Sequence, residues 1–181
     1  MNWKTLAFAA CLFSSVVLVS CDDDDEDDDT GNNTELNDAD QNFMVRTSIS
    51  NTAEVGTATL AISKATDPRV IAYAQHMIAE HSLAQTELKA LGTRVGYPVK
   101  DTLDPAHQTI AAQLSALSGR AFDSAYIHVQ VLDHEATLTN FENELDNGRH
   151  RDVLAYAEKY RPHIEQHLER ADSIATNLFP R

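Results

Sequence analysis

Apolar residues recur at helical spacing through most of this chain, and no segment alternates in the way of a strand. Apolar side chains three and four residues apart predict an amphipathic helix with one buried stripe. Four long segments show this spacing, over residues 38–65, 68–95, 120–146 and 151–179, and a shorter one spans 105–117. Because each helix must bury its stripe against another, the sequence predicts an all-α fold.

Capping and turn residues mark the ends of these segments. Two Asp-Pro pairs, at 67–68 and 104–105, place an N-cap residue before a proline in the first helical turn. Asp38 and Gln41 have the spacing of a capping box at the start of the first helix. The residues expected to end helices are Gly96 and the pair Asn147-Gly148.

Loop lengths predict how the helices connect. The two short loops indicate two antiparallel hairpins, and residues 96–119 form a longer crossover between them. The predicted domain, residues 38–181, is a ferritin-like four-helix bundle with one long crossover carrying a short extra helix. Pro162 lies inside the last helix, where it should kink the helix and leave the carbonyl of Glu158 without its usual donor.

The first 20 residues have the pattern of a secretion signal. An apolar run over residues 6–19 follows a short basic start and is too short to span a membrane. Ser20 and Cys21 follow directly, which resembles the lipobox of bacterial lipoproteins. We therefore expect Cys21 to carry lipid and to anchor the chain to a membrane. The alternative is an ordinary signal peptide beside a chance cysteine.

An unbroken acidic run occupies residues 22–29 and holds eight of the 28 acidic residues. Its charges repel one another, so residues 21–37 are expected to form a disordered tether. A sorting signal for the outer cell surface and a calcium-binding segment are the alternatives. We expect the protein in the cell envelope, anchored at the outer membrane. The chain has no basic patch, which argues against nucleic acid as a partner.

Three histidines and one glutamate interrupt the apolar stripes. His81, His134 and His167 each lie between apolar residues on the stripe of one helix, and the comparable inward residue of the first helix is Glu54. Counted from the loops, the four side chains lie at similar heights in the bundle. Three imidazoles and a carboxylate suit zinc, copper, iron or manganese. The sequence therefore predicts one metal site in the core.

Several neighbouring residues bear on this site. His163 matches the expected height better than His167 but lies off the stripe, so both remain candidates. Glu80, Asp133 and Glu135 adjoin the histidines and could add ligands or hold an imidazole N–H. The other histidines are expected at the surface or in incidental positions: His76, His107, His128 and His150.

Two functions are alternatives to simple metal binding: a non-enzymatic interaction module and a metal-dependent enzyme. Buried histidines also occur in structural hydrogen-bond networks, here with Glu54 paired to His81, and the chain would then be a non-enzymatic interaction module. A dinuclear oxygen-activating centre is disfavoured, because the chain contains no Glu-x-x-His. The sequence predicts no catalytic residue, and a metal-dependent enzyme would need an open coordination position.

Residues 60–92, 122–142 and 161–171 resemble the bacterial domain of unknown function 4142 family, and the likeness covers about residues 40–178. The resemblance implies a ferritin-like fold in exported and outer-membrane-associated proteins, and no assigned activity. It favours His167 over His163. The matching positions are Glu54, Glu80-His81 (where aspartate is the more usual acid), Asp133-His134, and Pro162 with His167.

Overall fold

The structure is a computed structural model that describes residues 34–179. It contains five helices: α1 (Asp38–Lys64), α2 (Pro68–Arg94), α3 (Pro105–Ser115), α4 (Gly119–Asn147) and α5 (Arg151–Leu178). No strand occurs among these residues, so the all-α prediction is confirmed. The expected signal peptide, Cys21 and the acidic run lie outside the described residues.

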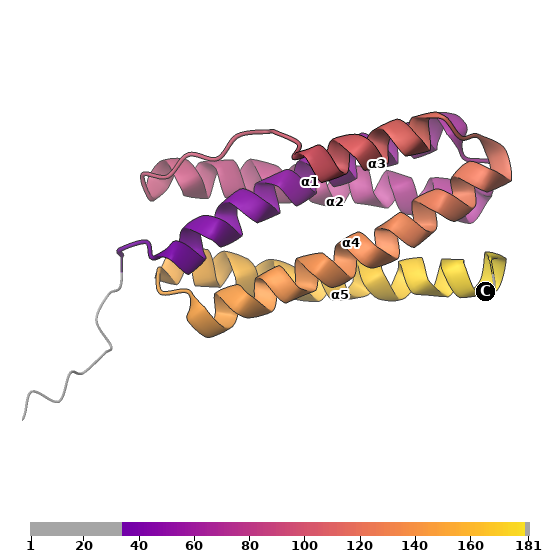
Figure 1. The fold of residues 1–181 in the computed structure, drawn as a ribbon. Coiled ribbons are helices and arrows are strands. Elements are labelled where there is room, and N and C mark those ends of the chain that lie inside the picture. Colours follow the sequence, from indigo (N-terminus) through magenta and orange to yellow (C-terminus); the bar gives the residue numbers. More distant parts are fainter. Residues whose placement is uncertain (1–33, 180–181) are drawn as a thin grey trace, which may run out of the picture. The chain divides into compact units, whose positions relative to one another are not determined.

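The four long helices lie side by side, as Figure 1 shows. α1 packs on α2 and α4 packs on α5, while α1 also contacts α4 and α2 contacts α5. The short α3 lies against α1 and α4. None of the helices in the described part of the chain is long and apolar enough to cross a membrane.

The start of α1 differs by one residue from the expected capping box. The side chain of Asn37 accepts a hydrogen bond from the N–H of Asp40 at 2.9 Å, and the Asp40 carboxylate accepts one from the N–H of Asn37 at 2.7 Å. Asn37 has an extended backbone, whereas Asp38 is already helical. The predicted box of Asp38 and Gln41 is therefore wrong, because the cap residue must be the last non-helical one.

Glycines end α2 and α4 in different ways. Gly96 has a φ of +77°, and the N–H of Tyr97 donates to the carbonyl of Gly92 at 2.8 Å. This is the left-handed helix end that glycine favours. Gly148 caps α4 with an extended backbone, and a side chain there would overlap Glu144. Glycine is therefore required at position 148 because a side chain has no room there, and not because of its φ angle.

Pro162 does not end α5, which continues as one helix from Arg151 to Leu178. Pro162 and Glu158 are both exposed, so water can reach the carbonyl that lost its donor. The expected kink stays a prediction.

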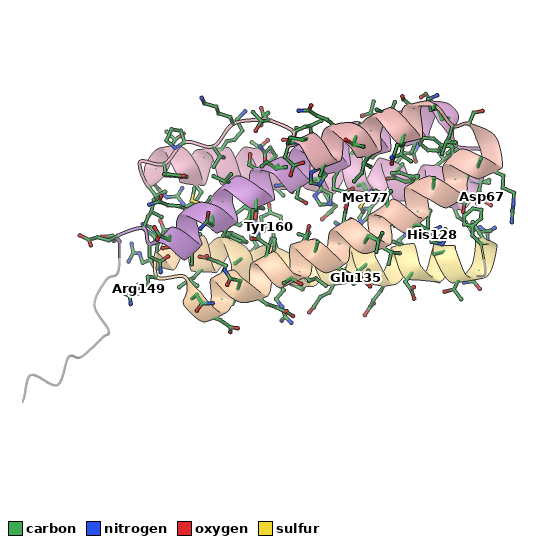
Figure 2. The ribbon with its side chains drawn as sticks, viewed as in Figure 1. Asp67, Met77, His128, Glu135, Arg149 and Tyr160 are labelled. Carbon is green, nitrogen blue, oxygen red and sulfur yellow. The ribbon has the colours of Figure 1, made fainter. Side chains whose placement is uncertain are left out.

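A buried polar layer divides the apolar core into two clusters. One cluster contains Met77 and the other contains Tyr160, both labelled in Figure 2. On each long helix the polar residues lie between members of the two clusters. The layer includes Asn51 and Glu54 on α1, His81 on α2, Gln130 and His134 on α4, and His167 on α5.

Candidate metal centre

Three imidazoles from three helices meet in the polar layer. His81, His134 and His167 are 2%, 1% and 3% exposed. Their ring centroids are 5.2–5.6 Å apart. One nitrogen from each ring lies within 4.8 Å of the other two, which makes this a group that could hold a metal ion. The apolar clusters on either side keep the rings from water.

The nitrogens are spaced more widely than the ligands of a formed metal site. Ligand nitrogens in a tetrahedral site with bonds of about 2.0–2.1 Å lie about 3.4 Å apart. The upper limit of 4.8 Å here exceeds that value, so the rings must turn inward slightly to share an ion.

A directional chain of hydrogen bonds sets the tautomer of His81. The carboxylate of Asp101 can only accept, so Gln85 directs its amide nitrogen to it at 2.7 Å. The amide oxygen of Gln85 then accepts from Asn51 at 3.3 Å. The remaining oxygen of Asn51 faces Nδ1 of His81 at 2.9 Å, so Nδ1 carries the proton. The lone pair of His81 therefore lies on Nε2.

His134 is fixed in the same tautomer by its own helix. Its Nδ1 lies 2.8 Å from the backbone carbonyl of Gln130, which can only accept, so Nδ1 donates and the lone pair is on Nε2. Nε2 of His81, Nε2 of His134 and Nδ1 of His167 are buried and have no hydrogen-bond partner among the described residues. Each ring thus presents an unused nitrogen inside the core.

Burial keeps all three rings neutral. It lowers the pKa of His134 to about 4. It also lowers the pKa of His167 to about 3 and that of His81 well below 6.5, and the neighbouring histidines lower both further. Neutral imidazole is the form that binds a metal, so no proton must leave these rings at pH 7.

Glu54 lies beside this group rather than within it. Its Oε1 is 3.8 Å from Nδ1 of His134, the nitrogen that donates to the Gln130 carbonyl. Burial, and then the charge of Asp133, raise the pKa of Glu54 to about 8. Its Oε2 has no partner among the described residues, like the hydroxyl of Tyr126 and the amide of Gln130. The set that meets is three histidines, without the predicted carboxylate as a fourth member.

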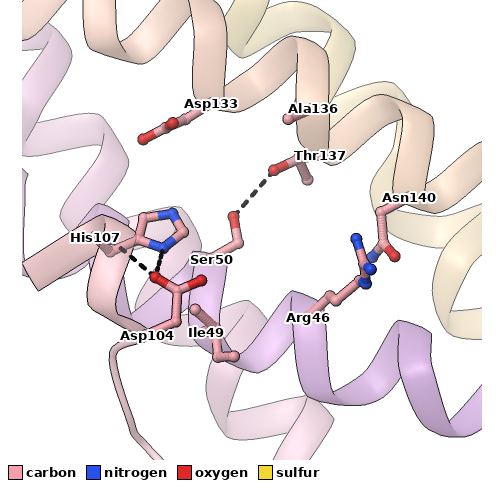
Figure 3. Close-up of a pocket in the computed structure, with 9 residues that line it drawn as sticks. All are labelled: Arg46, Ile49, Ser50, Asp104, His107, Asp133, Ala136, Thr137 and Asn140. Carbon is pink, nitrogen blue, oxygen red and sulfur yellow. Dashed lines mark hydrogen bonds and ion pairs between the residues drawn. The ribbon is translucent and has the colours of Figure 1, made fainter. Parts of the chain in front are cut away.

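The acidic neighbours face other partners. Glu80 accepts from Nδ1 of His163 at 2.9 Å. Asp133 lines a surface pocket with Asp104 and His107 between α1, α3 and α4 (Figure 3). Glu135 is exposed. The imidazole N–H groups expected to bind Glu80 or Asp133 are held instead by Asn51 and by the Gln130 carbonyl.

The structure separates the two candidate histidines of α5. The side chain of His163 is 44% exposed, whereas His167 is in the core. His76, expected to be incidental, packs edge-on against His167 with ring centroids 5.3 Å apart. His150 is also not at the surface: it is 4% exposed and its side chain caps α5.

The predicted pair of Glu54 and His81 does not form, because Asn51 occupies the Nδ1 of His81. Sequence reasoning missed Asn51 and Gln130, both polar residues on otherwise buried faces. Asn51 lies about one turn before Glu54, a spacing that could have revealed it. The Gln130 carbonyl is backbone and leaves no signal in the sequence.

The family model described as "Domain of unknown function (DUF4142)" matches residues 26–174. No curated protein and no solved structure matches the chain.

Proposed function

We propose that this chain, which belongs to the DUF4142 family, binds one divalent transition-metal ion through His81, His134 and His167. The observation that carries the proposal is that three buried imidazoles meet in the core and that each has a buried nitrogen without a hydrogen-bond partner among the described residues. Leaving a buried polar atom unpaired costs about 1–3 kcal/mol. A purely structural network would pair these atoms, whereas a bound ion uses all three at once.

The chemistry of the ligands narrows the metal. Imidazole suits zinc, copper and iron, and manganese prefers oxygen more strongly. A water molecule would complete the coordination, or Glu54 after its side chain turns away from Nδ1 of His134 and toward the ion. Asn51 and the Gln130 carbonyl would orient the rings as outer hydrogen-bond partners.

The proposal is tested by counting metal in the purified chain. Protein stripped with a chelator is dialysed against Zn²⁺, Cu²⁺, Fe²⁺ or Mn²⁺, and bound metal is measured by elemental analysis. We expect one ion per chain for at least one metal. In a variant with His81→Gln, His134→Gln and His167→Gln we expect none, because glutamine keeps much of the volume but not the imidazole lone pair.

Circular dichroism of the triple variant shows whether it is folded, so that a loss of metal is assigned to the ligands. Less than a tenth of an equivalent in the wild-type protein with all four metals contradicts the proposal. Equal loading of the wild-type protein and a folded triple variant also contradicts it, since the ion would then bind elsewhere.

For the fold, we propose the ferritin-like connection of two helix hairpins by one crossover. Its support is the pairing of α1 with α2 and of α4 with α5, and the placement of α3 within the segment that joins the pairs. Bundle cores of this class carry metal ligands that project inward from facing helices, as His81, His134 and His167 do here.

For location, we propose that Cys21 is acylated and anchors the domain to the cell envelope. The support is the sequence: a short apolar run, then Ser20-Cys21, then an acidic run. Radioactive palmitate fed to expressing bacteria should label the wild-type chain and not Cys21→Ser. Equal labelling of both, or of neither, contradicts lipid attachment at Cys21.

A further inference from the structure

A second group of histidine and glutamate side chains lies outside the core site, where α2 meets α5. His76 and Glu80 are one turn apart on α2, and His163 lies one turn before His167 on α5. His76 and Glu80 are half-buried, and the side chain of His163 is 44% exposed. None of the three belongs to the candidate metal centre.

These side chains lie along the α2–α5 face between solvent and the core histidines. Glu80 binds Nδ1 of His163 at 2.9 Å at the outer end. Further in, the ring of His76 touches the ring of His167 at 5.3 Å between centroids. The ring of His167 then lies 5.2 Å from that of His81.

We propose that His163, Glu80 and His76 capture a divalent transition-metal ion at the α2–α5 face and pass it to His167 and the core site. This inference rests on the proposed metal binding. Glu80 can hold the Nδ1 proton of His163, which leaves the Nε2 lone pair for an incoming ion. His76 then offers an imidazole between the surface and His167.

A route is needed because the core site is closed. The three core histidines are at most 3% exposed, so an ion must pass between two helices to reach them. Among the pairs of neighbouring long helices, α2 and α5 share the smallest contact. A partly hydrated ion passing between them meets nitrogen and carboxylate ligands at each step, which limits the cost of removing its water.

The opposite face offers a different set of groups. There, His107 is held by Asp104 at 2.7 Å, and Asp133 lines the same pocket (Figure 3). His134 follows Asp133 in sequence, but no ring contact joins His107 to a core histidine among the described residues. The α2–α5 face is the one with an imidazole touching the site. The pocket therefore supplies matched control residues.

The experiment compares loading rates with equilibrium affinities. Metal-free protein is mixed in a stopped-flow instrument with Zn²⁺ held by a chromogenic chelator, and transfer of the ion is followed by the dye. The test variant carries His76→Phe and His163→Gln, which keep an aromatic edge against His167 and a donor for Glu80. The control variant carries His107→Gln and Asp104→Asn, a histidine and its acidic partner in the pocket on the opposite face.

We expect the test variant to load at least about tenfold more slowly, within the range by which focused charge and ligands alter association rates. Its dissociation rate should fall by a similar factor, so that its Kd for Zn²⁺ stays near the wild-type value. The control variant should load at the wild-type rate.

Three outcomes overturn the inference: wild-type loading in the test variant, slower loading in the control alone, or a weaker Kd at an unchanged association rate. The last result would make His76 or His163 a ligand rather than part of a route. All three require that the wild-type protein binds Zn²⁺, so they are distinct from a failure of the metal site itself.

Discussion

Replacing His134 with alanine should lower the affinity of the protein for its metal ion by more than about 100-fold. His134 supplies one of three ligand nitrogens, with its lone pair fixed on Nε2 by the Gln130 carbonyl. Loss of an outer hydrogen-bond partner alone commonly costs 10–100-fold in affinity, so loss of a ligand should cost more. Isothermal titration with the metal that the wild-type protein retains measures the change.

The matched control is His128→Ala on the same helix. His128 makes the same bond to a carbonyl one turn earlier, with Nδ1 2.7 Å from the Ser124 oxygen, but it lies outside the cluster and is only half-buried. It should bind metal like the wild-type protein. The metal affinity of Asn51→Leu should lie between those of His134→Ala and His128→Ala, because this change removes only the hydrogen-bond partner of His81. Equal affinities for His134→Ala and His128→Ala would rule out His134 as a ligand.

Replacing Glu54 with glutamine should stabilise the metal-free protein, and by more as the pH rises. Burial raises the pKa of Glu54 from 4.5 to about 8, so the folded state holds a proton that the unfolded state releases above pH 4.5. The stability that protonated Glu54 contributes to the wild-type fold is therefore lost as the pH rises from 4.5 to 8. The difference in the free energy of unfolding between the variant and the wild type should grow by about 1.4 kcal/mol per pH unit, to ~5 kcal/mol in total. We call this difference the gap.

Urea denaturation of chelator-treated protein at pH 5, 6.5, 8 and 9 measures this gap. Because the comparison is between two proteins that differ at one residue, other titrating groups cancel to first order. With the metal bound, the positive ion favours ionised Glu54, so the pH dependence of the gap should shrink. A gap that is constant from pH 5 to pH 8 in the metal-free protein would show that Glu54 is ionised in the fold.

The core histidines change the stability of the fold with pH in the opposite direction from Glu54. Their pKa values in the fold lie below 6.5, so the stability they contribute is present above pH 6.5 and is lost as the pH falls toward 4. Between pH 4.5 and 6.5 Glu54 partly offsets this loss in the wild-type protein. The Glu54→Gln variant should therefore lose stability more steeply on acidification over the same range.

Much of the fold could be predicted because its signals are local. Helical spacing, two Asp-Pro pairs and Gly96 act within a turn or two of the chain, and they located the helix ends to within two residues. His81, His134 and His167 could also be picked out, since each breaks an apolar stripe that must face inward. The error at the start of α1 was of the same local kind, since Asn37 and Asp38 are both good caps.

Side-chain partners between helices could not be predicted in this way. Both Glu54 and Asn51 lie on the inward face of α1, but only the rotation of α1 against α2 decides that Asn51 reaches His81. The same rotation places Oε1 of Glu54 3.8 Å from Nδ1 of His134. The choice between His163 and His167 likewise depends on how α5 is turned.

The sequence alone determined that the chain forms a helical domain with ligand-type side chains buried midway along its helices, because periodicity and capping are properties of single segments. The tertiary structure alone decided which nitrogens are free, which proton each ring carries, and that His76 touches the site. Those features depend on packing angles and on hydrogen bonds between helices far apart in the chain, and no local pattern encodes them.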